Sequence, residues 1–207
     1  MINEVNHLIL TSSFLPHLSL NNGKMGSVLF FYKYYTITNN SIYRKFAETL
    51  LCEITEEIDN TIPVGFFNGI SGIGWGVEYL KYKKHIKFNT DNILSFIDLY
   101  IMRFDPLRLD DDSFEYGIEG IAIYILSRFR NSNKNIAFDK SYLNCLFKRC
   151  NQIEKKSNII NKYITYIKTG YIESYSFDEI LRYLLSKDTI NSISWQKCYN
   201  ELEIRVL

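Results

Sequence analysis

The sequence lacks the features that mark membrane, secreted and nucleic-acid-binding proteins. Its 207 residues include 24 Lys and Arg against 23 Asp and Glu, so the net charge is +1 and no basic excess favours nucleic acid. Apolar runs such as 121–126 are far shorter than the ~20 residues of a membrane helix. The N-terminus lacks the basic start and small-residue cleavage site of a signal peptide. We therefore expect a cytoplasmic protein that binds neither nucleic acid nor membrane.

Metal ligands and alanine are also scarce. The chain has four cysteines and three histidines, and no two cysteines form a C-x-x-C pair. Cys145 and Cys150 would lie roughly 140° apart around a helix, so they would not face one metal ion. We expect reduced thiols, no bound metal and no other cofactor, with Cys150 in the core and Cys198 exposed. Only three alanines occur, so hydrophobic periodicity is a better guide than helix propensity.

Six of the ten glycines form three G-x-x-G units, spaced 46 and then 48 residues apart. Each unit opens a strongly apolar run, and a proline precedes each unit by six to eleven residues. A fixed period of this length indicates a helical repeat array. The units are Gly23 and Gly26, Gly69 and Gly72, and Gly117 and Gly120.

Amphipathic segments lie between the glycine units. Apolar residues fall at helical spacing in 43–58, 93–104 and 142–153. The expected caps of the second and third segments are Thr90 or Asp91, and Asp139 or Ser141. Each period therefore holds one helix that is apolar nearly all round and one with a polar outer face. Such pairs predict an inner and an outer layer, as in an α/α toroid; a straight solenoid is the alternative.

The pattern fades after residue 153. Ser176 and Glu179 form a capping box for a helix that extends to about Leu185, and residues 195–202 predict a last helix. Gly170 is interpreted as a degenerate fourth unit. We predict an all-α single domain over 1–207, a partial toroid of about three hairpins. Its repeats lie at about 20–60, 66–105 and 114–155, followed by a divergent helical tail at 156–207.

Two interpretations of the glycines remain open. Glycine allows a sharp turn and a close approach between helix starts, which is a packing role. Bare helix N-termini also present N–H groups to a ligand. We favour packing for most of these positions, because repeat architectures need small residues at their contacts.

Residues 65–80 (GFFNGISGIGWGVEYL) resemble a glycine-rich repeat of lanthionine synthetase C-like proteins. Residues 20–26 (LNNGKMG) and 115–120 (EYGIEG) resemble sister repeats, and the resemblance covers roughly 20–155. It implies an α/α toroid, a bacterial source and a role in peptide modification. Family enzymes join cysteine thiols to dehydrated Ser or Thr, with a zinc ion held by two Cys and one His in W-C-x-G and C-H-G motifs.

The sequence departs from the family at its catalytic positions. Neither zinc motif occurs, and the family's G-x-x-H-G histidine is replaced by Asn68, with Asn22 and Tyr116 in the sister units. Asparagine forms hydrogen bonds but transfers no proton near pH 7. We therefore expect a non-zinc peptide-binding or accessory member and name no catalytic residue; whether it is an enzyme stays open. The candidate ligand-binding residues are Asn22, Asn68, Trp75, Tyr116 and Glu119.

Carboxylates gather before the third unit, at 110–112, Glu115 and Glu119. Glycosidases of the α/α-toroid type use such acids at inner-helix starts, but a charge run is more often a solvated loop, which we favour. Glu119 stands out because the sister units have Ser71 and Met25 there. Two alternative functions follow: a carbohydrate-active enzyme, and one half of a two-chain cyclase whose zinc site lies on the other chain.

Three hairpins do not close a ring. A flank formed by Leu29, Phe30, Phe31 and Tyr34 would be uncovered, and so large an apolar surface predicts a homodimer or a second chain. Alternatively, the N-terminal segment 8–20 or the tail covers this apolar surface within the same chain.

Overall fold

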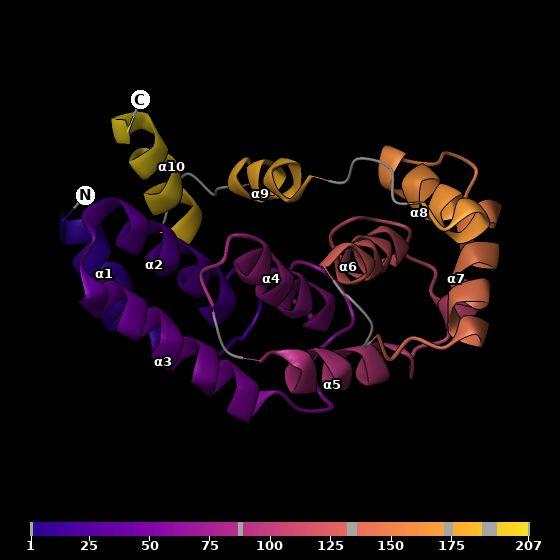
Figure 1. Cartoon of the computed structure of the whole chain (residues 1–207), viewed down its shortest axis with the longest axis horizontal. Helices are drawn as coiled ribbons and strands as arrows, with labels where there is room; N and C mark the ends of the chain where they lie inside the picture. Colours follow the sequence, from indigo (N-terminus) through magenta and orange to yellow (C-terminus); the bar gives the residue numbers. More distant parts are fainter. Residues whose placement is uncertain (1, 87–88, 132–135, 172–175, 188–193, 207) are drawn as a thin grey trace. The chain divides into compact units, whose positions relative to one another are not determined.

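The computed structural model describes residues 2–86, 89–131, 136–171, 176–187 and 194–206, and the regular secondary structure in these ranges is entirely helical (Figure 1). The all-α class predicted from the sequence is confirmed. None of the described helices is long and apolar enough to cross a membrane. The helices are α1 (Ile2–Ser12), α2 (Lys24–Thr38), α3 (Ser41–Glu57), α4 (Ile70–Tyr82), α5 (Asp91–Ile101), the 3-10 helix η1 (Pro106–Arg108), α6 (Ile118–Asn131), α7 (Lys140–Gln152), α8 (Asn158–Thr169), α9 (Phe177–Leu185) and α10 (Trp195–Val206).

The chain forms two compact units. Unit 1 comprises residues 1–59 and 176–207, and unit 2 comprises residues 60–175. Unit 1 therefore contains the first hairpin with both ends of the chain, and unit 2 contains the second and third hairpins with α8. The assignment of 1–207 to one domain stays a prediction.

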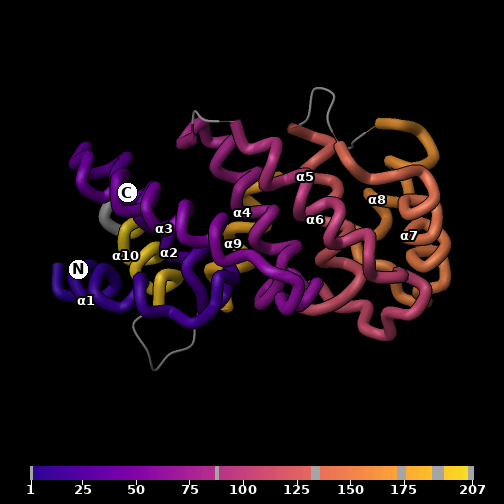
Figure 2. The backbone as a smooth tube through the Cα atoms, turned by 90° about the horizontal axis from the view of Figure 1, so that it is seen from below, coloured from indigo at the N-terminus to yellow at the C-terminus, as the bar shows by residue number. Residues whose placement is uncertain are grey.

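The core of unit 1 is built around α2. Every residue from Lys24 to Tyr32 is buried, and α2 packs against both α3 and α10. By contrast, α3 buries one side only, through Ala47, Leu50, Leu51 and Ile54. Figure 2 shows α1 and α10 beside each other, and the two helices are in contact. The predicted pairing of an all-apolar inner helix with a one-sided outer helix is confirmed for this hairpin.

The uncovered flank expected on this hairpin is absent. Leu29 is 1% exposed, Phe30 and Phe31 are 0% exposed, and Tyr34 is half-buried. Both α1 and α10 contact α2 and supply the cover. The open-flank argument for a partner is therefore wrong, and association with a second chain stays a prediction without that support.

Helix α10 lies in the core of unit 1 along one face. Its buried side chains follow helical spacing at Trp195, Cys198, Tyr199 and Leu202. The prediction that Cys198 is exposed is therefore wrong, because Cys198 shares the apolar face with Trp195. Burial raises the pKa of the Cys198 thiol to about 11, so this group is protonated at neutral pH.

Unit 2 is centred on α4 and α6, which pack against each other. Residues Ile70 to Leu80 of α4 are all buried, and the Tyr124 ring of α6 fills the space that a Cβ atom at Gly74 would need. Around this pair, α5 contacts α4, while α7 and α8 contact α6 (Figure 1). On α5, Phe96 and Leu99 are 39% and 56% exposed, so the expected polar outer face is wrong for this helix.

The ends of several helices match the predicted caps. Ser176 accepts a hydrogen bond from the Glu179 N–H and opens α9, which ends at Leu185 as predicted. Asp139 caps α7 in the same way. Thr90 occupies the cap position of α5 without a side-chain bond. Gly170, at φ 69°, ends α8 in the left-handed conformation, so its interpretation as a fourth repeat unit is wrong.

Candidate functional site

The three glycine units share one backbone loop that closes each inner-helix start. In each, the first helical N–H donates to the carbonyl seven residues earlier: Lys24 to His17 at 2.9 Å, Ile70 to Pro63 at 2.8 Å and Ile118 to Asp111 at 3.0 Å. The first orphan donor of each helix is thus satisfied by its own loop. This geometry leaves that N–H unavailable to a ligand.

The first glycine of each unit makes this loop possible. A Cβ atom at Gly69 would collide with the Pro63 carbonyl oxygen, and one at Gly117 with the Asp111 carbonyl oxygen. The packing interpretation is confirmed at these positions, since only glycine leaves room for the returning backbone. The turn positions the residue that precedes each glycine.

The second and third repeats of unit 2 are joined through these loops. The N–H groups of Phe66 and Phe67 both donate to the Glu115 carbonyl, each at 2.9 Å. The Phe67 and Tyr116 rings meet edge to face with centroids 6.4 Å apart. We call residues 63–69 and 111–117 the loop pair. It brings the two helix starts, and the residues before their glycines, to one part of unit 2.

Asn68 and Tyr116 lie in the loop pair and face solvent. Asn68 is exposed and Tyr116 is 54% exposed, although the glycines that follow them are buried. The cap position of α4 is Gly69, which makes no side-chain cap bond. Asn68 is therefore not the N-cap of α4.

Glu119 lies in the first turn of α6 and is half-buried. Burial raises the pKa of its carboxyl group, a hydrogen bond from Ser157 lowers it, and the charge of Glu115 raises it again. The pKa of the Glu119 carboxyl group is raised overall. Because Ser157 also caps α8, Glu119 stands where two helices of unit 2 begin.

Two other predicted residues lie elsewhere. Trp75 is 0% exposed and packs in the core against Phe66 and Tyr79, so no ligand reaches its ring in this conformation. Asn22 is exposed and belongs to unit 1. The loop pair therefore unites Asn68 with Tyr116, beside the helix that carries Glu119, and does not include Asn22 or Trp75.

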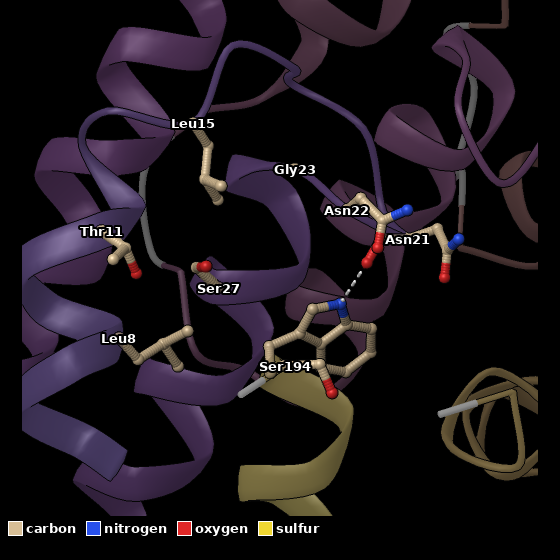
Figure 3. Close-up of a pocket in the computed structure, with 9 residues that line it drawn as sticks. Leu8, Thr11, Leu15, Asn21, Asn22, Gly23, Ser27 and Ser194 are labelled. Carbon is tan, nitrogen blue, oxygen red and sulfur yellow. Dashed lines mark hydrogen bonds between the residues drawn. The ribbon is translucent and has the colours of Figure 1, made fainter. Parts of the chain in front are cut away.

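Asn22 lines a small pocket of about 120 Å³ in unit 1 (Figure 3). Its walls come from α1, the loop before α2, α2 itself and the start of α10. At about 30 Å³ per molecule the pocket has room for a few waters. The lining residues are Leu8, Thr11, Leu15, Asn21, Asn22, Gly23, Ser27, Ser194 and Trp195.

The acidic run before α6 has a structural role. Asp112 forms an ion pair with Arg149 of α7 at 2.5 Å, and the same guanidinium donates to the Leu109 carbonyl at 3.1 Å. The Asp111 carboxylate accepts the Ser113 N–H at 2.7 Å. Residues 110–112 are exposed, as expected for a solvated loop, and their contacts favour that interpretation over a glycosidase site.

The most buried charges were missed by the sequence analysis. Arg128 of α6 is 1% exposed and binds two fully buried carboxylates, Glu78 of α4 and Asp98 of α5, at 2.8 Å each. Tyr124 donates to Asp98 at 2.6 Å, and Asn131 donates to Glu78 at 2.7 Å. The sequence did contain a signal for this cluster, namely charged residues inside otherwise apolar helices. Such residues are rarely buried unless they are paired, so they indicate a buried ion pair.

The described residues do not fit the zinc site of the family. Among them, no three His, Cys, Asp or Glu side chains come together in a group that could hold a metal ion. Cys150 is buried in the core, as predicted, and burial raises its pKa to about 12. A metal-bound thiolate needs the opposite shift.

Comparisons with known proteins agree with this architecture. The family model for lanthionine synthetase C-like proteins matches residues 16–173. No curated protein and no solved structure matches the chain. The family match spans all three glycine units and most of the chain, from the first loop to beyond α8. The chain therefore belongs to the lanthionine synthetase C-like family.

Proposed function

We propose that this lanthionine synthetase C-like protein binds a peptide at the loop pair without zinc chemistry. In this proposal it is a non-zinc accessory member of a peptide-modification system in the bacterial cytoplasm. The loop pair recognises the peptide, and the modifying chemistry belongs to a partner. The absence of a fitting metal-ligand group among the described residues supports binding over thioether formation.

One observation carries the proposal: the residue before the first glycine is exposed in every repeat. Asn22, Asn68 and Tyr116 are exposed, whereas the glycine after each of them is buried. The loop backbone forms internal hydrogen bonds, and the side chains at these three positions face outward. In the family pattern this position includes a functional histidine, and here it carries groups that bind without transferring protons.

The side chains suit an extended peptide. The Asn68 amide both donates and accepts hydrogen bonds, as a peptide bond does, and the Tyr116 ring offers an apolar face with a polar tip. Two backbone bonds to the Glu115 carbonyl hold the loops together before any ligand arrives. Such pre-organisation lowers the entropic cost of binding.

The test measures binding of synthetic peptides rich in Ser, Thr and Cys by fluorescence anisotropy in the presence of a chelator. We expect Asn68→Asp and Tyr116→Ala each to weaken binding about tenfold, which corresponds to roughly 1.4 kcal/mol. Asn92→Asp is the matched control, because Asn92 is also exposed in unit 2 and undergoes the same charge change at the start of α5. Melting temperatures should stay level in all three variants.

Equal binding by wild type, Asn68→Asp and Tyr116→Ala would contradict the proposal. Binding that appears only when zinc and a second chain are supplied would favour the two-chain cyclase. Binding of oligosaccharides that is lost on Glu119→Gln would favour the carbohydrate-active alternative.

A further inference from the structure

Part of the lining of the pocket in unit 1 is apolar (Figure 3). Leu8 and Leu15 line it together with Trp195, which is buried. Trp195 Nε1 already donates to the Leu20 carbonyl at 2.8 Å, so the indole contributes apolar ring surface to the pocket rather than a free N–H. This part of the lining favours an apolar group, because burial of such a group removes apolar surface from water.

The lining also contains a hydroxyl with unused hydrogen-bonding capacity. Ser27 lines the pocket, and its Oγ lies 2.9 Å from the Ser12 hydroxyl. The single Ser12 hydroxyl proton has two acceptors, Ser27 Oγ and the Leu8 carbonyl at 2.5 Å. A hydroxyl oxygen accepts two hydrogen bonds, and no other donor among the described residues binds Ser27 Oγ. Whichever acceptor takes the Ser12 proton, Ser27 therefore keeps at least one lone pair for an occupant of the pocket.

The volume and charge of the pocket define the occupant that fits it. At about 120 Å³ the pocket is slightly smaller than a cavity of about 150 Å³ that binds benzene. None of the nine lining residues is charged, so an ion would lose its hydration without gaining a counter-charge. Asn22 is the only exposed member of the lining and marks where the pocket meets solvent. The pocket therefore fits a small, uncharged group.

We propose that this pocket binds an uncharged group of about benzene size that carries one hydroxyl. The ring packs against Leu8, Leu15 and Trp195, and the hydroxyl donates a hydrogen bond to Ser27. Such a group comes either from a free phenol or from the tyrosine side chain of a peptide, which have the same chemistry. The pocket belongs to unit 1 and the loop pair to unit 2, so this inference does not rest on peptide binding at the loop pair.

The test follows the indole N–H resonances of the full chain by NMR while phenol is added. The chain has two tryptophans: Trp195 lines the pocket, and Trp75, buried in unit 2, is the internal control. We expect the Trp195 signal to shift saturably, with a Kd on the order of 1 mM, and the Trp75 signal to stay.

Two variants test the hydroxyl contact. In Ser27→Ala, phenol should bind about fivefold more weakly, as expected for the loss of one hydrogen bond. Benzene, which has the same ring without the hydroxyl, should bind no more weakly than to the wild type. Ser13→Ala is the matched control, because Ser13 is exposed in unit 1 and does not line the pocket; it should leave phenol binding unchanged.

A Trp195 signal that phenol does not shift saturably would overturn the binding site and leave the pocket to water. Equal losses of phenol and benzene binding in Ser27→Ala, or no loss of either, would overturn the hydroxyl contact. If Ser27→Ala fails to fold by circular dichroism, Ser27→Cys makes the same comparison, because a thiol is only a weak acceptor. Once phenol binding is established, N-acetyl-tyrosine amide separates the two sources: affinity equal to or above that of phenol supports a peptide side chain, and lower affinity supports a free small molecule.

Discussion

In unit 1, side chains of α10 bind the loop that precedes Gly23. In unit 2, backbone N–H groups of the second repeat bind the loop that precedes Gly117. Trp195 and Gln196 bind the Asn21 carbonyl, whereas the N–H groups of Phe66 and Phe67 bind the Glu115 carbonyl. A backbone donor survives almost any substitution, but a side-chain donor is lost with one. A single substitution can therefore remove one of these donors in unit 1, whereas the donors in unit 2 remain.

The two units also bury charge differently. In unit 2, Arg128 is enclosed with Glu78 and Asp98, all at 0–1% side-chain exposure. In unit 1, Lys24 is 5% exposed, but its partners Glu53 and Glu57 keep 29% and 52% exposure. If Lys24 is removed, water can therefore still reach its carboxylate partners in part. If Arg128 is removed, water does not reach Glu78 or Asp98. We therefore expect replacement of Arg128 to lower the free energy of unfolding much more than replacement of Lys24.

The largest effect is expected for Arg128→Met. It leaves Glu78 and Asp98 as buried carboxylates without their cation, which costs about 3–5 kcal/mol of unfolding free energy. Urea unfolding measures the change. A loss below about 1 kcal/mol would show that water or other groups compensate these carboxylates, and the contrast with unit 1 would fail.

A second substitution tests the backbone geometry of the loop pair. Gly69→Ala places a methyl group against the Pro63 carbonyl, and such overpacking costs about 1–3 kcal/mol. Gly170→Ala is the comparison, because a Cβ atom there meets nothing within 4 Å and is disfavoured only by the φ of 69°; it should cost about 1 kcal/mol. If the two losses were equal, the close approach would not explain the glycine at position 69.

Lys24→Met is expected to cost about 1 kcal/mol, since its carboxylate partners Glu53 and Glu57 are partly exposed to water. Thermal unfolding of this variant beside Arg128→Met sharpens the comparison of the two units. A loss as large as that of Arg128→Met would contradict the argument from solvent access.

The last prediction concerns the pH dependence of stability. Burial raises the pKa of Glu78 above 4.5, although hydrogen bonds from Arg128 and Asn131 lower it. The folded chain then binds this proton more readily than the unfolded chain, so the Glu78 contribution to stability falls as pH rises from 4.5 through the folded pKa, by at most about 1.4 kcal/mol per pH unit. In Glu78→Gln, the unfolding free energy should vary less across this window; an unchanged slope would contradict the assignment.

Local spacing allowed most of the helices and all three repeats to be predicted from the sequence. Helical periodicity and caps such as Ser176 are properties of neighbouring residues, so α9 was predicted to its last residue. The position of α10 was not predictable in this way, because Trp195 binds Leu20 across 175 residues. For the same reason Cys198 was expected at the surface, and α2 was expected to lack cover.

The candidate site was predictable in part. Equivalence of the repeats identified Asn68 and Tyr116, and the structure brings their loops together through the Glu115 carbonyl. Trp75 was included because it lies in the same motif, but one turn into α4 the side chains face the core. The partners of Arg128 come from two other helices, so the sequence could indicate only that buried charges need partners.

The central claim is that the loop pair binds peptide without zinc. Isothermal titration of chelator-treated protein with a Ser-, Thr- and Cys-rich peptide tests it most directly, with metal content measured on the same sample. We predict saturable binding that added zinc leaves unchanged, and far less than one zinc per chain. Binding that requires zinc, or about one zinc per chain that is lost in Cys145→Ser or Cys150→Ser, would contradict the account.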